Sequence, residues 1–293
     1  MSILRTLVVV PSRIAGVFRY LLISEGNREN RDVLEKILAP KLILPTPASG
    51  DMVKDVISEC CKMGLTTEIV KKETREICLS KTTRQLYPGS IFDAIKFRML
   101  VNELIMDKNN KENHDMCKLL AWFLTQDVGT MNGSYEGLSQ ALRNQIDEGR
   151  LGLTNKSRYD NFRFWSVFLG FASVFRNLKA GTEQLIPNPT NFLERKLPEV
   201  FGHNQNREMA LPDLMHIISE TCPILDDGIF QKEITQSLPT REPERISSAM
   251  SLALLSLRDK KIISLETRAD APGLVVMENV TSLRITHIIY NQI

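Results

Sequence analysis

The stretch from Pro243 to Gly273, PERISSAMSLALLSLRDKKIISLETRADAPG, most constrains the fold of this chain. It predicts an amphipathic helix that runs directly into a β-hairpin. That succession forms the second half of a winged helix, a module that contacts DNA or another protein. The rest of the chain can be organised around this stretch.

Composition limits what the chain can do. Its 293 residues, 43% of them hydrophobic, can build a sizeable core, and the length predicts two or three domains. The formal net charge is only +2, so no overall basic field draws the chain to nucleic acid or to an acidic membrane surface. Any nucleic-acid binding must therefore come from a local basic patch.

The cysteines and the N-terminus indicate a cytoplasmic protein without a membrane segment. The apolar run SILRTLVVV is too short for a signal peptide with its flanks or for a membrane span, and we expect a buried or edge strand there. The thiols are odd in number, lack paired CxxC spacing and are interpreted as reduced. They are Cys60, Cys61, Cys78, Cys117 and Cys222.

Residues 1–86 predict a second winged helix. Helical patterns begin at Pro11 and Glu29, and Ser49 can cap a third helix that ends near Gly64. Two short strands, 65–70 and 76–79, then flank a charged tip. With the expected N-terminal strand, this gives one strand, three helices and a hairpin.

The predicted fold is mainly α, with winged-helix domains at the two ends, 1–86 and 209–293, joined by a helical middle domain, 87–208. Apolar stripes at 91–105, 116–124, 138–146 and 162–175 support the helical middle, and another helix follows Thr190. The aromatic stripe at 162–175 predicts a buried helix. The alternative is that its aromatic side chains, interleaved with Arg158, Arg163 and Arg176, stack single-stranded bases.

The sequence shows no motif for catalysis, a cofactor or a metal. Phosphate-binding GxxxxGK[ST] and GxGxxG loops are absent, and the four histidines lie far apart without metal-ligand spacing. Glu194-Arg195-Lys196 superficially offers the end of a nuclease site, but a solvated helical face is the simpler interpretation. Asp226-Asp227 is explained by helix capping. We therefore expect no enzyme, cofactor or metal.

The candidate DNA contacts are basic or small polar residues on the two predicted wings and on the last helix. The C-terminal candidates are Arg241, Arg245, Ser247, Ser248, Ser251, Arg258, Lys260, Lys261 and Arg268, and those on the N-terminal wing are Lys71, Lys72 and Arg75. Acidic residues interleave with the C-terminal set, where seven basic residues meet six acidic ones from Thr240 to Ile293. This balance keeps a protein-binding adaptor open as an alternative.

Four strings of this sequence, SSAMSLALLSLRDKKIISLETRADAPG, LRITHI, VVVPSR and FRFWSVFLGFA, occur in an order that resembles the DpdG component of bacterial Dpd anti-phage gene clusters. Such clusters insert deazaguanine bases into DNA and restrict unmodified DNA. The resemblance implies a cytoplasmic defence component that acts beside helicase or nuclease partners. It brings no catalytic residues onto this chain.

The leading hypothesis is a non-enzymatic component that binds double-stranded DNA within such a defence complex. The second is a structural adaptor whose wings hold partner subunits together. A third, a transcription regulator, requires a defined operator and usually a symmetric dimer. The sequence has no obvious heptad dimerisation helix, so this hypothesis ranks last.

Overall fold

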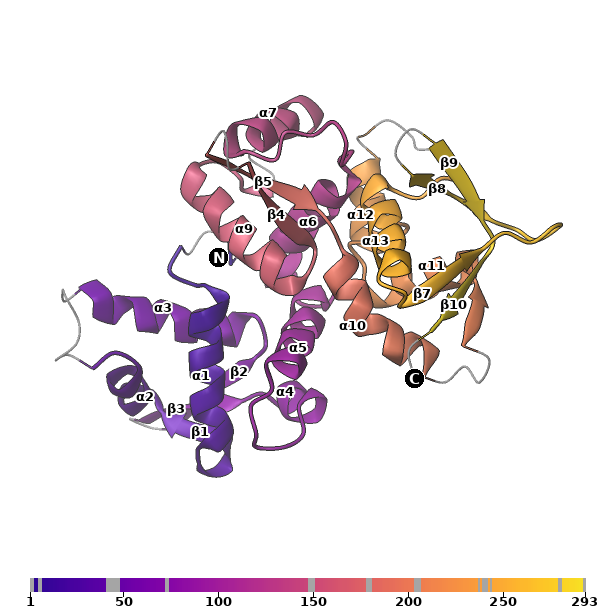
Figure 1. Ribbon diagram of the computed structural model, residues 1–293. Coiled ribbons are helices and arrows are strands. Elements are labelled where there is room, and N and C mark those ends of the chain that lie inside the picture. Colours follow the sequence, from indigo (N-terminus) through magenta and orange to yellow (C-terminus); the bar gives the residue numbers. More distant parts are fainter. Residues whose placement is uncertain are drawn as a thin grey trace. The chain divides into compact units, whose positions relative to one another are not determined.

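The computed structural model divides the chain into two compact units, coloured along the sequence in Figure 1. The N-terminal unit comprises Met1–Met116 and Ser157–Phe168, and the C-terminal unit comprises Cys117–Lys156 and Leu169–Ile293. The structure describes residues 3–4, 7–40, 48–71, 74–146, 151–177, 181–202, 207–236, 238, 242, 244–278 and 281–291. No helix in these ranges combines the length and the hydropathy that crossing a bilayer requires.

The N-terminal unit combines helices with one antiparallel sheet, in which β3 lies between β1 and β2. Its first strand follows the first helix, whereas the sequence predicted that a strand would precede it. In chain order the elements are α1 (Pro11–Ile23), β1 (Arg28–Asn30), α2 (Arg31–Leu38), α3 (Ala48–Lys62), β2 (Thr66–Lys71), β3 (Thr74–Leu79), α4 (Lys81–Leu86), α5 (Ala94–Met106) and most of α9 (Lys156–Leu169).

Local sequence explains where these helices begin. Pro11 occupies the first turn of α1, where its missing N–H costs nothing. The Asn30 side chain accepts hydrogen bonds from the N–H groups of Asp32 and Val33 and so caps α2. Asp93 caps α5 in the same way. The helices expected from Pro11, from Glu29 and from residue 91 are confirmed, with the second beginning at Arg31 and the third at Ala94.

The segment before α1 is buried but is not the strand that its sequence predicted. Ile3 and Val9 are 1% and 0% exposed, yet residues 3–4 and 7–8 form turns. The backbone of this segment bonds to α9: Asn161 Nδ2 donates to the Ile3 carbonyl at 2.6 Å, and Trp165 Nε1 donates to the Val9 carbonyl at 2.9 Å. Side chains from α9 therefore supply the partners that a neighbouring strand would have supplied.

Aromatic contacts also join α1 to later elements and explain why the unit does not end near residue 86. The Phe18 ring lies 5.0 Å from Tyr87 and 4.9 Å from Phe97, and Phe97 lies 6.2 Å from Phe168 of α9. Large buried rings contribute much of a core's stability. The compact units differ from the expected boundaries at residues 86 and 208, because they place α5 and most of α9 with the N-terminal elements.

The C-terminal unit also mixes helices with small antiparallel sheets, in which β10 lies between β6 and β7, β4 pairs with β5, and β8 pairs with β9. Its elements are most of α6 (His114–Thr125), α7 (Tyr135–Gln145), β4 (Ala172–Asn177), β5 (Thr182–Pro187), α10 (Thr190–Phe201), β6 (Glu208–Ala210), α11 (Leu211–Thr221), α12 (Ile229–Thr235), α13 (Ser248–Asp259), β7 (Ile263–Glu266), β8 (Leu274–Glu278), β9 (Thr281–Ile285) and β10 (His287–Tyr290).

Two predictions about the helices and strands after residue 156 are wrong. The aromatic stripe expected as one helix to Phe175 ends at Leu169, because Gly170 adopts a φ of +93° and the chain continues as β4. The hairpin expected directly after α13 is also different, since β7 pairs with β10 rather than with β8. The hairpin β8–β9 is inserted between these two partners.

The two units share an order of elements. In each, a helix precedes a short strand, further helices follow, and two strands close a three-stranded sheet. In each sheet the last strand lies in the middle: β3 between β1 and β2, and β10 between β6 and β7. The two units are therefore similar in the order of their elements and in the order of the three strands.

We expect Trp165→Phe to lower the free energy of unfolding by about 1–3 kcal/mol, because it retains an aromatic ring but leaves the buried Val9 carbonyl without its donor. Chemical denaturation of the full chain measures this. Phe164→Leu is the control, since the Phe164 side chain is 50% exposed on the same helix. Equal stability of Trp165→Phe and the unmodified chain would contradict the assigned role of this bond.

Candidate nucleic-acid interface

The serines at the start of α13 are engaged inside the fold. Ser247 caps α13 by accepting from the Met250 N–H, and its own N–H donates to Asp226 Oδ2 at 2.6 Å. Ser248 Oγ accepts from the Val128 N–H at 3.0 Å, and Ser251 Oγ accepts from the Met277 N–H at 3.1 Å. The Ser247 hydroxyl thus caps α13 itself, and the hydroxyls of Ser248 and Ser251 bond α13 to neighbouring segments.

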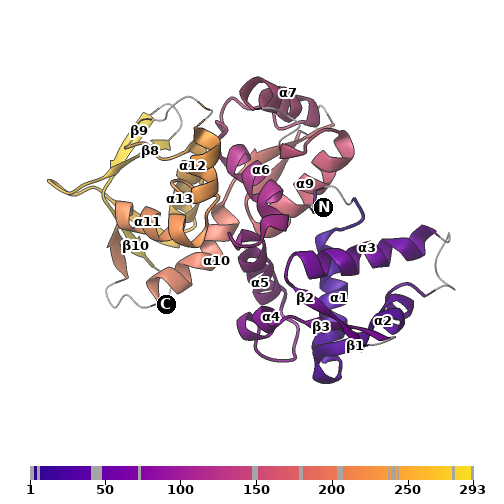
Figure 2. The same cartoon turned by 180° about the vertical axis from the view of Figure 1, so that it is seen from behind.

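Helix α13 is covered along almost its whole length. Figures 1 and 2 show it among the other elements of its unit, and it contacts α10, β7 and β8. Ser247 is 7% exposed and Ser251 only 1%, and Asp259 is the one exposed residue of the helix, all of which is described. Its remaining surface consists of half-buried side chains, those of Ser248, Leu252, Leu255, Ser256 and Arg258. The small side chains that suggested close approach to phosphates instead permit close packing by β8.

The described cations around α13 are mostly paired with carboxylates of the same unit. Two of the candidates are not among these pairs. Lys261 is exposed, with a left-handed φ of +60°, and Arg241 lies outside the described residues. The pairs are Arg245 with Glu242 at 3.7 Å, Arg258 with Asp259 at 3.0 Å, Lys260 with Glu194 at 2.6 Å, and Arg268 with Glu208 and Glu266. Pairing leaves little net positive charge here for a phosphate backbone.

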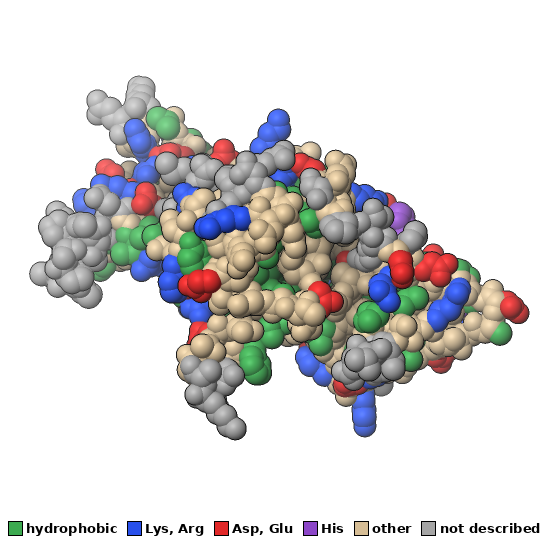
Figure 3. Space-filling view, turned by 90° about the horizontal axis from the view of Figure 1, so that it is seen from above, with side chains coloured by type: hydrophobic (Ala, Val, Ile, Leu, Met, Phe, Trp, Pro, Cys, Tyr) green, Lys and Arg blue, Asp and Glu red, His purple; other side chains and the backbone are tan. Residues whose placement is uncertain are grey.

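Figure 3 shows one molecular face, on which basic and acidic side chains of the described residues are interspersed.

Arg268 forms ion pairs with two carboxylates, those of Glu208 and Glu266. Its hydrogen bonds to Glu208 and Glu266 raise its pKa, and its bond to Glu208 lowers the pKa of that carboxyl group. Arg268 thus connects the loop after β7 to β6 rather than to a ligand.

The N-terminal wing, the hairpin formed by β2 and β3, arranges its cations differently on its two faces. Lys71 lies on the outer face, where its Nζ is 3.1 Å from Glu76 Oε2. Arg75 lies opposite Val70 on the same face as Ile77, which is buried in the core. Arg75 is exposed, and no described carboxylate pairs with it. Lys72 lies outside the described residues.

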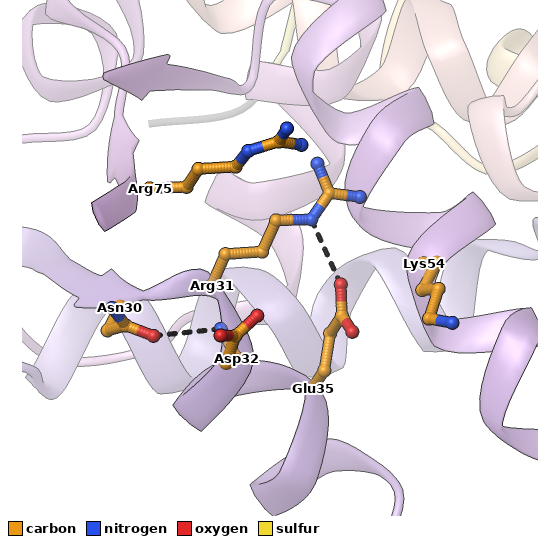
Figure 4. Close-up of a pocket in the computed structure, with 6 residues that line it drawn as sticks. All are labelled: Asn30, Arg31, Asp32, Glu35, Lys54 and Arg75. Atoms are coloured by element: carbon orange, nitrogen blue, oxygen red, sulfur yellow. Dashed lines mark hydrogen bonds and ion pairs between the residues drawn. The ribbon is translucent and has the colours of Figure 1, made fainter. Parts of the chain in front are cut away.

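Arg75 contributes to a polar pocket of about 320 Å³ in the N-terminal unit, shown in Figure 4. We call it the Arg31–Arg75 pocket. Its lining comes from β1, α2, α3 and the N-terminal wing and consists of Asn30, Arg31, Asp32, Glu35, Lys54 and Arg75. Sequence reasoning selected Arg75 but missed Arg31, because α2 was not considered as part of a binding surface. The register of β2 with β3, which places Arg75 on the helix-facing side, was the missing information.

Arg31 is held in this pocket by two carboxylates. Its Nε donates to Glu35 Oε1 at 2.9 Å and its Nη1 donates to Glu68 Oε1 at 3.0 Å. Desolvation opposes the charged guanidinium, but the hydrogen bonds from Glu35 and Glu68 together raise the pKa of Arg31 above its ordinary value. The guanidinium is therefore charged and fixed in orientation.

The Glu194-Arg195-Lys196 sequence does not converge on a common site. Glu194 pairs with Lys260, Arg195 Nη2 donates to the Leu169 carbonyl at 2.7 Å, and Lys196 pairs with Glu199. Lys196 is only 7% exposed, so the solvated helical face expected here is wrong for this residue. Within the described residues, no three His, Cys, Asp or Glu side chains are grouped as metal ligands.

Asp226 caps a helix, but not the one that its position in the sequence predicted. It is 3% exposed and accepts from the Ser247 N–H at the start of α13, whereas Gly228 precedes α12 without a side-chain cap.

The five cysteines are free thiols, and burial raises the pKa of Cys117 to about 12. A thiol in that state is a poor nucleophile.

Comparison with protein families adds a separate observation. The model of a family described as DpdG-like matches residues 1–271. The chain belongs to the DpdG-like family. This membership supports a role connected with Dpd defence clusters, as the sequence resemblance implied. Comparisons with curated proteins and with solved structures gave no match.

We expect Ser247→Ala to lower the free energy of unfolding by about 1 kcal/mol, because α13 loses its cap. The same variant should leave DNA affinity unchanged, because the Ser247 hydroxyl is buried. Denaturation and fluorescence anisotropy on the same sample measure both. Ser256→Ala is the control, since its hydroxyl bonds only within α13 among the described residues. A loss of DNA affinity without a loss of stability would assign Ser247 to the ligand instead.

We expect Arg268→Ala to raise the pKa of Glu208 toward its ordinary value, because the arginine bond is the main cause of the lowered pKa. A lowered carboxyl pKa stabilises the fold above the unfolded-state pKa, and this contribution is lost as pH falls through the folded-state value. Carbon NMR titration of the Glu208 carboxyl measures the shift. Arg284→Ala, which removes a partner of Glu244, should leave it unchanged.

Proposed function

We propose that this chain is a non-enzymatic DNA-binding component of a Dpd anti-phage defence complex, and that its N-terminal unit makes the DNA contact. The order helix, strand, helix, helix and hairpin in residues 11–79, with the strand order β1–β3–β2, supports a winged helix. Membership of the DpdG-like family supports the cellular role. The complex is cytoplasmic, and its other members include a helicase or a nuclease.

The observation that carries the DNA contact is the position of the cations on the N-terminal wing. Arg75 is exposed without a described carboxylate partner, and Lys71 lies on the other face of the same hairpin. Lys72 follows directly in the sequence. Exposed lysine and arginine side chains on a protruding hairpin bind backbone phosphates without reading sequence.

Helix α3 limits this contact to low sequence specificity. Its described exposed residues are Lys54 and Asp55, a cation beside a carboxylate, so the helix offers no uniformly basic face to a groove. Affinity from the wing alone is electrostatic and falls steeply with salt. We therefore propose a component that holds duplex DNA while partner proteins act on it.

A protein-binding adaptor is the second candidate, and the covered α13 favours it for the C-terminal unit. That helix would be the groove-reading helix of a second winged helix, yet Ser251 is 1% exposed and the neighbouring cations are ion-paired. The strands and loops of this unit then make the protein contacts. In this arrangement one chain joins DNA to a partner subunit.

Charge reversal on the N-terminal wing tests the proposal. We expect Lys71→Glu with Lys72→Glu to weaken duplex binding by more than about tenfold at low salt and to flatten its salt dependence, because phosphate contacts are lost. Fluorescence anisotropy of the full chain with a labelled duplex, repeated over a salt series, measures both quantities.

Arg241→Glu with Arg245→Glu is the matched variant in the C-terminal unit, and we expect a loss of less than about threefold. The reverse result would transfer the DNA contact to the C-terminal unit. Absence of duplex binding by the unmodified chain at low salt would contradict DNA binding and favour the adaptor.

A further inference from the structure

We propose that a surface on α4, α5 and the loop 87–93 between them (Figure 1) binds an acidic amphipathic helix of a partner protein. We call it the α4–α5 surface, and its apolar members are Leu86, Ile91 and Ile95. The N-terminal wing, to which the DNA contact is assigned, contributes none of its residues. The surface therefore gives the chain a contact with protein in addition to the proposed contact with DNA.

The three apolar side chains are unusually exposed for their size. Ile91 is 85% exposed, Ile95 60% and Leu86 48%. One such side chain on its own needs no explanation, but several in one region are typical of a surface that another protein covers. Burying them on binding is favourable, because apolar area is removed from water.

The Tyr87 hydroxyl brings these three side chains into one region. It donates to the Ile91 carbonyl oxygen at 3.0 Å and accepts from the Asp93 N–H at 2.6 Å. The loop is thus folded back onto the residue that follows Leu86, and Ile95 lies two positions beyond Asp93. Leu86, Ile91 and Ile95 therefore extend from backbone positions that one hydroxyl group holds together.

Aromatic packing beneath the α4–α5 surface fixes its shape. The Tyr87 ring lies 5.0 Å from the Phe18 ring, and the Phe92 ring lies 5.6 Å from the Phe97 ring. Tyr87 and Phe97 are buried, and Asp93 caps the start of α5. A surface that is already ordered loses little conformational freedom when a partner binds, so the contact is favourable.

Exposed cations accompany the apolar side chains. None of them forms an ion pair with a described carboxylate, and they are Arg19, Lys81, Arg84 and Lys96. Arg19 belongs to the α4–α5 surface because its guanidinium lies 4.1 Å from the centroid of the Phe92 ring. Asp93 is the one acidic residue from 81 to 98, and it offsets one of these charges. The remaining positive charges favour an acidic partner.

An amphipathic helix fits this combination better than DNA or a membrane surface does. Its apolar face suits the three exposed apolar side chains, and acidic residues along the borders of that face suit the surrounding cations. Duplex DNA offers phosphates to the cations but little apolar surface that would cover Ile91. Peripheral membrane contacts use an apolar face along a whole helix, whereas α4 has six residues and Ile91 lies in a loop.

The experiment measures binding of the full chain to a synthetic amphipathic peptide that has leucine on one face and glutamate on the other, by fluorescence anisotropy of a dye on the peptide. We expect Ile91→Ser with Ile95→Ser to weaken binding at least about tenfold, because less apolar area is buried. Lys81→Glu with Arg84→Glu should weaken it about fivefold at low salt and less at high salt. The same peptide with lysine in place of glutamate should bind at least about fivefold more weakly.

Ile37→Ser is the control, because Ile37 is a 45% exposed isoleucine on α2 of the same unit and lies outside the α4–α5 surface. We expect it to change the affinity for the peptide less than about twofold. Denaturation of each variant separates loss of the surface from loss of the fold. Equal effects of Ile37→Ser and of Ile91→Ser with Ile95→Ser would overturn the assignment, as would absence of peptide binding by the unmodified chain.

Labelled duplex DNA and vesicles that contain phosphatidylserine test the other two occupants. If Lys81→Glu with Arg84→Glu weakens duplex binding as much as charge reversal on the N-terminal wing does and leaves peptide binding unchanged, the surface belongs to the DNA contact and the assignment is overturned. If the vesicles bind, the peptide does not, and Ile91→Ser with Ile95→Ser prevents vesicle binding, the surface contacts a membrane, which also overturns it. Duplex binding that persists without peptide binding leaves the proposed function in place and overturns the protein contact alone.

Discussion

The alternation of side chains along β3 is the constraint on which the N-terminal unit depends. Ile77 and Leu79 enter the core from one face of this strand, and the pairing of β3 with both β1 and β2 fixes that face. A shift of one residue would turn the apolar pair away from this side of the core and bring Glu76 toward it. The same register carries Arg75 past the edge of the core, so the arrangement that stabilises the sheet also positions a cation beside α2.

In the C-terminal unit, the packing depends on the small side chains of α13. Ala249, Ser251 and Ala253 allow neighbouring elements to approach the helix closely, and Ser251 hydrogen-bonds the backbone of β8 at Met277. Two similar orders of elements thus lead to different surfaces. The third helix of the first unit, α3, has the exposed residues Lys54 and Asp55, whereas α13 in the second unit is mostly buried.

Local features were predictable from the sequence, and long-range pairing was not. Pro11, Gly64 and the polar caps marked helix ends because capping involves residues only a few positions apart. The partner of β7 lies beyond an inserted hairpin, and nothing near Ile263 indicates β10 as that partner. The contribution of Arg31 was hidden for the same reason: it depends on Glu68 and Arg75, which are brought to α2 only by the sheet. The burial of Ser247 and Ser251, at 7% and 1% exposure, could likewise not be read from their residue type.

The position of α9 has a consequence for synthesis on the ribosome. The N-terminal unit lacks part of its core until residue 168 has been made, since Asn161 and Trp165 bond to the segment before α1. At about 5–20 residues per second, the interval between residues 116 and 168 lasts roughly 3–10 s. During that interval apolar side chains of the first unit, such as Phe97, are incompletely covered because Phe168 has not yet been made. This interval is long enough for a chaperone to bind the nascent chain.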